Sequence, residues 1–163
     1  MTVSLLPSLL RQGGLKGSVL NDYRSGCPVS LGLDVFGDKW TLLIVRDLTF
    51  NGKRHFGELL MSDERISTSI LANRLKMLTN EGILTRTDNP NHKQKRVYSL
   101  TEKGIDLLPI LMQVCIWSYK YKPVGETYVA PVEAYELASL DPAEQRRLKA
   151  ALREVHLGSA EAA

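Results

Sequence analysis

The sequence predicts a mainly α-helical fold with one small β-hairpin: a winged helix-turn-helix domain with dimerisation helices at its N- and C-terminal ends. Three observations predict this class: a short helix followed by a capped second helix, a strand–turn–strand pattern directly after it, and a long apolar helix after the strands. A chain of 163 residues is long enough for one such domain with appendages. We expect a flexible arm over residues 1–21, the winged domain over 22–121 with a dimerisation helix over 102–121, and a C-terminal extension over 122–163 with a helix over about 142–157.

The first helices follow from the signals at their ends. Pro28 suits the first position of a helix that runs to Phe36, which a glycine follows. Asp38 can cap a second helix over residues 39–48, whose apolar residues have the spacing of a buried face. An Asn-Gly turn then separates this helix from a third, short one over residues 56–61.

The next helix, over residues 67–80, has the pattern expected of a DNA-reading helix. Leu71, Leu75 and Leu78 recur at helical spacing and predict a buried stripe. The major groove of DNA admits one α-helix, so a reading helix needs a buried back and a polar front. We expect the front to contact DNA, with Asn73 suited to adenine, through Ser67 as N-cap, Thr68, Ser69, Ala72, Asn73, Lys76 and, at the flank, Arg74.

A basic β-hairpin follows. Residues 83–87 and 96–100 are rich in strand-forming side chains, and the segment between them begins with turn-forming residues. Cations at the tip of such a wing can reach the sugar-phosphate backbone or the minor groove. Each charge cluster also has a simpler interpretation, as solvated surface. The predicted backbone contacts are His92, Lys93, Lys95 and Arg96 in the wing, with Lys53 and Arg54 ahead of the third helix.

The helix predicted over residues 102–121 is apolar almost all the way round. Such a helix must be covered on more than one side, which a small winged domain cannot do alone. We expect a second copy of the chain to cover it, and the alternative is that residues 123–163 fold back over it. The predicted dimer contacts are Leu108, Leu111, Met112, Cys115 and Trp117.

Several motifs in order resemble the HxlR family of winged-helix regulators, over roughly residues 22–121. The resemblance implies a homodimer that binds double-stranded DNA at a near-palindromic operator, assembled through the N-terminal segment and the long helix after the wing. Many members carry a proline-rich wing, whereas this chain has Asn-Pro-Asn-His-Lys-Gln-Lys over residues 89–95. The motifs are Gly-Cys-Pro at 26–28, Gly-Asp-Lys-Trp at 37–40, Arg-His-Phe-Gly-Glu-Leu at 54–59, Ile-Ser at 66–67, Glu-Gly-Ile at 81–83 and Tyr-Ser-Leu-Thr-Glu-Lys-Gly at 98–104.

The two cysteines have different expected roles. Cys27 lies beside Pro28 at a helix N-terminus, a position that favours the thiolate. Some HxlR members sense oxidants or electrophiles at this Cys-Pro position, so the resemblance makes Cys27 a candidate redox sensor; the alternative is an inert thiol. Cys115 is expected in the core or the dimer interface. A disulfide from Cys27 to Cys115 of a second copy is conceivable if their Cα atoms lie within about 7 Å.

No catalytic set, metal site or cofactor motif is read from the sequence. The three histidines are far apart and lack metal-ligand spacing, and two cysteines cannot build a structural zinc site alone. Neither a signal peptide nor a membrane span is read, so we expect a cytoplasmic protein without a membrane partner. The leading hypothesis is a transcriptional repressor with a small-molecule or oxidant effector. Its alternatives are a winged-helix protein–protein module and a ligand-binding or enzymatic domain.

Overall fold

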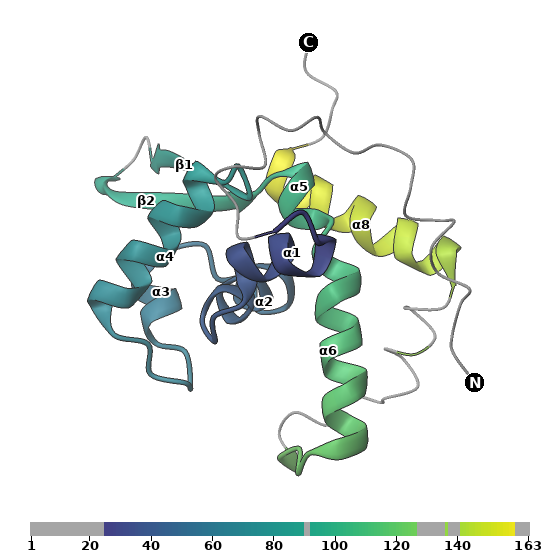
Figure 1. Ribbon diagram of the computed structural model, residues 1–163. Helices are drawn as coiled ribbons and strands as arrows, with labels where there is room; N and C mark the ends of the chain where they lie inside the picture. The colour runs from purple at the N-terminus through teal and green to yellow at the C-terminus, as the bar shows by residue number, and fades with distance from the viewer. Residues whose placement is uncertain (1–24, 90–91, 127–135, 137–140, 159–163) are drawn as a thin grey trace, which may run out of the picture. The chain divides into compact units, whose positions relative to one another are not determined.

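The computed structural model describes residues 25–89, 92–126, 136 and 141–158 (Figure 1). The chain divides into two compact units, Met1–Gly37 and Asp38–Ala163, and each is described by itself. In the first unit the described secondary structure is helix α1, Pro28–Phe36, which begins where Pro28 predicts. The arm predicted over residues 1–21 lies outside the described residues.

The second unit opens with three helices. The helix predicted to begin at residue 39 begins at Thr41 with Trp40 as its N-cap residue, and the Asp38 carboxylate accepts the backbone N–H groups of Trp40 and Thr41 at 2.8 and 3.1 Å. Ser67 caps the third of these helices by accepting the N–H of Ile70 at 3.4 Å. The Ser67 cap is therefore confirmed, whereas Asp38 bonds to the start of α2 from two residues before its N-cap position. The helices are α2, Thr41–Phe50; α3, Phe56–Leu60; and α4, Thr68–Asn80.

The predicted hairpin follows α4. Strand β1, Leu84–Asn89, pairs antiparallel with β2, His92–Leu100, and the register is regular until it shifts after Asp88. The base of β2 also bonds to the segment before α3, because the N–H of Tyr98 donates to the carbonyl of Arg54 at 2.8 Å. The hairpin is thus attached to the helix-turn-helix, and Figure 1 shows it beside α4.

After the hairpin, the single helix expected over 102–121 is broken in two. Helix α5 covers Glu102–Ile105 and α6 covers Leu108–Tyr121. Pro109 explains the break, because it has no N–H to donate to the carbonyl of Ile105 and its ring would clash there. The proline therefore begins a new helix rather than kinking a continuous one.

The buried core is formed by the apolar residues that recur at helical spacing in the sequence. Leu71, Leu75 and Leu78 of α4 are at most 2% exposed, and Val45 and Leu48 of α2 are buried with them. The fold class is the predicted one, mainly helical with one two-stranded hairpin. Within the described ranges, no helix combines the length and the apolar character needed to cross a bilayer.

Candidate nucleic-acid interface

Helix α4 presents a polar front and a buried back. Its leucine stripe packs inward, and the opposite face is exposed. Arg74 at the flank is half-buried and forms a salt bridge with Asp38 at 3.2 Å. The carboxylate of Asp38 therefore partly compensates the positive charge of Arg74. The geometry required for groove entry is therefore present, and the DNA contacts themselves stay a prediction. The exposed residues of the predicted front are Ser67, Thr68, Ser69, Ala72, Asn73 and Lys76.

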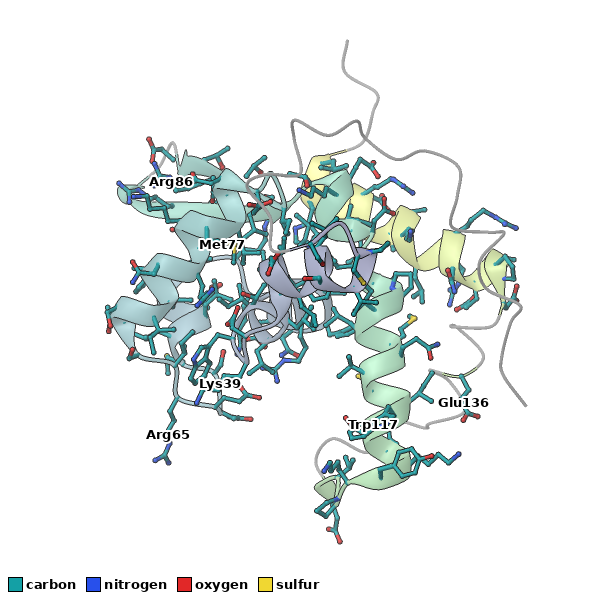
Figure 2. The ribbon with its side chains drawn as sticks, in the orientation of Figure 1. Lys39, Arg65, Met77, Arg86, Trp117 and Glu136 are labelled. Carbon is teal, nitrogen blue, oxygen red and sulfur yellow. The ribbon has the colours of Figure 1, made fainter. Side chains whose placement is uncertain are left out.

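The wing next to α4 carries exposed charge of both signs. Arg96 is exposed and its Nε lies 4.0 Å from the carboxylate of Asp88, which stands opposite it in the strand register. Arg86 on β1 is exposed as well (Figure 2). The side chains of His92, Lys93 and Lys95 lie outside the described part of the structure, so their predicted contacts stay predictions.

Lys53 and Arg54, expected to contact the DNA backbone, are instead engaged inside the protein. The Nζ of Lys53 donates to Asp47 and to Ser62, at 2.9 Å each. The guanidinium of Arg54 donates to the carbonyls of Tyr98 and Val155 at 3.2 and 3.1 Å, and to the hydroxyl of Ser99. Sequence position alone could not reveal these partners, which lie up to 101 residues away. Neither cation is free to neutralise a phosphate in this structure.

The partner of Lys53 is a buried carboxylate that ties α2 to the turn before α4. The Asp47 side chain is 2% exposed, and it accepts hydrogen bonds from Arg46, Asn51, Lys53 and Ser62. Burial alone would raise the pKa of Asp47, but the bonds from Ser62, Lys53 and Arg46 outweigh it and hold the pKa below its ordinary value. The carboxylate therefore stays charged and keeps the turn in place.

Arg65 is a basic residue of this turn that sequence reasoning missed. Its φ of +54° lies in the left-handed region, which a non-glycine residue adopts at a cost of about 1 kcal/mol or more. The side chain is exposed and extends from the turn (Figure 2). Its position two residues before the Ser67 cap could have drawn attention to it, but the backbone conformation could not be read from the residue type.

A protein-family model described as HxlR-like helix-turn-helix matches residues 35–126, more than half of the chain. The chain belongs to the HxlR-like family. An HTH-type transcriptional regulator of Synechocystis, sll1512, is 36% identical over 86 residues, which are 53% of this chain and 63% of that protein. The matched segment thus spans less than two thirds of this relative.

Two solved structures share the fold. PA1607, described as a transcription factor, is 36% identical with a TM-score of 0.55, over 66% of this chain and 70% of PA1607. The redox regulator HypR in its oxidized form is 34% identical with a TM-score of 0.52, over 60% of this chain and all of HypR. The winged helix-turn-helix fold and the family predicted from the sequence motifs are confirmed.

Helix α8, Pro142–Leu157, lies beyond the segment that the HxlR-like model matches. Its Leu148 and Leu152 pack against Leu108 and Met112 of α6, which are each 2% exposed. Two ion pairs, Lys149 with Asp106 at 2.6 Å and Arg153 with Glu102 at 2.7 Å, extend this contact to α5 and the residue after it. On this face of α6, the alternative in which the C-terminal extension folds back is the one observed.

The predicted dimer contacts differ in how far they are covered within the chain itself. Leu108, Leu111 and Met112 are buried within the chain, at 2–5% exposure, because α8 and α2 cover them. Cys115 is half-buried, and Trp117 remains 54% exposed (Figure 2). The uncovered apolar surface of α6 is made by Pro109, Ile110, Val114 and Trp117, together with the polar Gln113.

The C-terminal end of α8 is fixed by a buried histidine. The N–H of Leu100 donates to Nδ1 of His156 at 3.3 Å, and Nε2 of His156 lies 3.2 Å from the carbonyl of Leu48. Both bonds are satisfied only by the neutral ring with its proton on Nε2. Burial, together with repulsion from Arg54, lowers the pKa of His156 and so favours this neutral form.

Cys27 occupies the N-cap position of α1 and is exposed. Hydrogen bonds from the backbone N–H groups of Ser30 and Val29 lower the pKa of its thiol. Burial raises the pKa of Cys115. Both cysteines are free thiols, and they belong to different units of the chain, so their pairing across a dimer stays a prediction. Among the described residues, no cluster of metal-ligating side chains occurs.

Proposed function

We propose that the protein is a sequence-specific DNA-binding transcriptional regulator, a homodimer that represses transcription by occupying a near-palindromic operator. The observation that carries this proposal is the form of α4: a capped helix with a leucine back, an exposed polar front and a wing beside it. Phosphates would be contacted by the exposed Lys76, Arg96 and Arg65, with Arg74 at the flank and the wing residues His92, Lys93 and Lys95. Lys53 and Arg54, which were also predicted, could contact phosphate only by giving up their internal hydrogen bonds.

The dimer would form on the surface of α6 that α8 leaves uncovered. An exposed tryptophan among apolar neighbours is typical of an interface. Pro109, Ile110, Val114 and Trp117 would lie in that interface, with α1 as the second candidate element. Two α4 helices about 34 Å apart would then read successive turns of the major groove.

Asn73 is expected to read a base. We expect Asn73→Ala to relax specificity at one base pair by about 1–3 kcal/mol, because a bidentate contact to adenine would be lost. The measurement is fluorescence anisotropy with promoter DNA and with single-base variants of the site. Asn80→Ala, the same change at the exposed far end of α4, is the matched control and should leave specificity intact. Unaltered sequence preference in the Asn73 variant would contradict the assignment.

Salt dependence separates the DNA-binding regulator from a protein–protein module with the same fold. Contact with six to ten phosphates should lower DNA affinity by about 10³- to 10⁵-fold between 50 and 200 mM salt. A module that binds only proteins would show weak DNA binding without preference for the promoter. The polar front of α4 and the exposed wing cation Arg96 favour the regulator.

Arg65→Gly should raise stability and weaken DNA binding together. Glycine relieves the left-handed backbone at this position, which adds up to about 1 kcal/mol to the free energy of unfolding. Loss of the guanidinium should weaken binding to all sequences and lower the salt slope by about one. Arg65→Ala, which keeps the strain, should lose affinity without gaining stability. Urea unfolding and anisotropy measure the two effects, and wild-type affinity and slope in both variants would exclude Arg65 as a phosphate contact.

Cys27 is expected to react as the sensor thiol. We expect its alkylation by monobromobimane, measured against pH in a Cys115→Ser background, to have a midpoint below the ordinary thiol pKa, because α1 stabilises the thiolate. Cys115, measured in a Cys27→Ser background, should have a midpoint above it because it is half-buried. Diamide treatment should change promoter affinity in the wild-type chain but not in Cys27→Ser. The oxidised form of HypR, a redox regulator similar to this chain, supports the proposal.

A further inference from the structure

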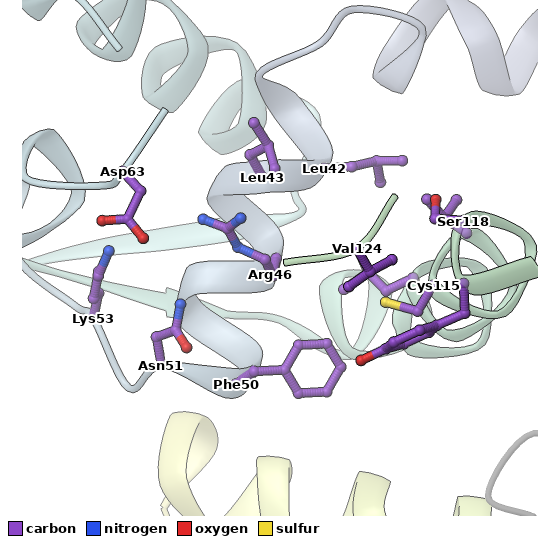
Figure 3. Close-up of a pocket in the computed structure, with 13 residues that line it drawn as sticks. Leu42, Leu43, Arg46, Phe50, Asn51, Lys53, Asp63, Cys115, Ser118 and Val124 are labelled. Atoms are coloured by element: carbon purple, nitrogen blue, oxygen red, sulfur yellow. The ribbon is translucent and has the colours of Figure 1, made fainter. Parts of the chain in front are cut away.

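A pocket of about 340 Å³ opens between α2 and α6 (Figure 3). It lies within the Asp38–Ala163 unit, and of the residues predicted to contact DNA only Lys53, which is bonded to Asp47, lines it. Its volume is in the range of small-molecule sites. The walls are predominantly apolar, and their aliphatic and phenyl side chains are Leu42, Leu43, Phe50, Leu111, Val114 and Val124.

The two cations that line the pocket, Arg46 and Lys53, are already paired with carboxylates of the protein, and a third carboxylate, Asp63, lines it as well. Arg46 donates to both carboxylate oxygens of Glu64 at 2.5 and 3.1 Å, and to Asp47 at 2.7 and 3.0 Å. Lys53 donates to Asp47 as well. An anionic ligand would have to displace these carboxylates, at the cost of leaving Asp47 without its partners in a buried position. The cations therefore offer no unpaired charge to an anion, and the predominantly apolar walls suit an uncharged occupant.

Polar groups that could orient such a ligand lie on the α6 side. Cys115 and Ser118 of α6 line the pocket, with Val124 from the segment after it. Arg46, Asn51 and Lys53 lie on α2 and the loop after it, and Asp63 lies on the turn before α4 (Figure 3). The ring of Phe50, 41% exposed, offers a flat apolar surface. A ligand with an aromatic body and a hydroxyl group matches this combination.

We propose that this pocket binds a small uncharged aromatic molecule and that its occupancy changes DNA affinity. Only the second half rests on the proposed function. The route runs through the α2 wall: Arg46 bonds to Glu64 and Asp47 bonds to Ser62, and both partners lie in the turn that precedes α4. A ligand that shifts Arg46 or Phe50 acts on the groups that hold this turn, and a population shift follows if the two DNA-binding states differ in ligand affinity.

The first test compares two probes with the same aromatic frame. N-phenyl-1-naphthylamine is uncharged and fluoresces in apolar surroundings, and 1-anilinonaphthalene-8-sulfonate adds one negative charge. We expect saturable binding of the uncharged probe at one site per chain, and weaker binding of the sulfonate by about tenfold or more. Tighter binding of the sulfonate would overturn the charge argument, and absence of saturable binding of the uncharged probe would overturn the site.

The second test fills the pocket. Ser118→Trp and Leu43→Trp each place a large ring in the pocket and should weaken binding of the uncharged probe by about tenfold or more. Lys120→Trp, on the exposed surface of α6 outside the pocket, is the matched control and should bind as the wild type does. Circular dichroism and urea midpoints establish that each variant is folded. If both Trp variants are folded and still bind the probe with wild-type affinity, the probe binds at another surface and the pocket proposal is wrong.

The third test distinguishes failure of this proposal from failure of the proposed function. It also distinguishes a small ligand from a second copy of the chain as the occupant of the pocket. A chain that binds the uncharged probe in this pocket but binds no promoter DNA contradicts the regulator while keeping the site. A chain that binds promoter DNA with affinity unaffected by saturating probe contradicts the coupling. If the pocket is filled by a second copy of the chain instead, probe binding will disappear as protein concentration rises through dimer formation, and that result would overturn the proposal.

Discussion

Replacing Asp47 with alanine will lower the free energy of unfolding by about 3–5 kcal/mol. The carboxylate is 2% exposed and is the shared partner of Arg46 and Lys53, so its loss leaves cations partly buried without compensation. It also removes the acceptor of Asn51 and Ser62, which hold the loop and the turn on either side of α3. Urea unfolding followed by circular dichroism measures the change.

Glu64→Gln is the matched control for Asp47. Glu64 bonds to the same Arg46 but is 31% exposed in its side chain, so water can replace it and the expected loss is about 1 kcal/mol or less. Promoter binding provides the second readout. Because Ser62 lies in the turn before α4, Asp47→Ala should weaken DNA binding even at temperatures where the variant remains folded. Equal losses of stability in both variants would show that burial of the carboxylate is not what makes it important.

Most of the fold could be predicted from local patterns in the sequence. The Ser67 cap and the leucine period of α4 are set by a few neighbouring residues, and the structure follows them. Partners distant in sequence could not be predicted. The bond from Arg54 to Val155, and the packing of Leu148 on Leu108, depend on how the C-terminal extension returns to the domain. Composition shows an apolar helix that needs cover, but it does not say which segment covers it.

The same distinction applies to the candidate site. The polar front of α4 is a property of one helix and was predictable from period and capping. The engagement of Lys53 was not, because the buried Asp47 that binds it lies in the middle of an apolar pattern and gives no sign of its partners. A cation near a recognition helix is a candidate phosphate contact only when no internal carboxylate has already bound it.

His156→Ala is expected to lower the free energy of unfolding by about 2–6 kcal/mol, although His156 lies outside the HxlR-like segment. The change leaves the buried N–H of Leu100 and the carbonyl of Leu48 without partners, at about 1–3 kcal/mol for each group. Glu154→Ala, at an exposed position of the same helix, should change stability by about 0.5 kcal/mol or less. If both variants unfold at the wild-type urea midpoint, the end of α8 is not held by the histidine.

The pH dependence gives a sharper test of the same contact. The pKa of His156 is lower in the folded chain than its ordinary value near 6.5, so below that pH the unfolded chain binds the proton and the folded chain resists it. Stability from this group is therefore complete above pH 6.5 and is lost as pH falls, at up to about 1.4 kcal/mol per pH unit. His156→Phe removes this titration while the other two histidines remain. The wild-type chain should thus lose more stability than His156→Phe between pH 7 and pH 5, and equal slopes would mean that the ring is already free to protonate in the folded state.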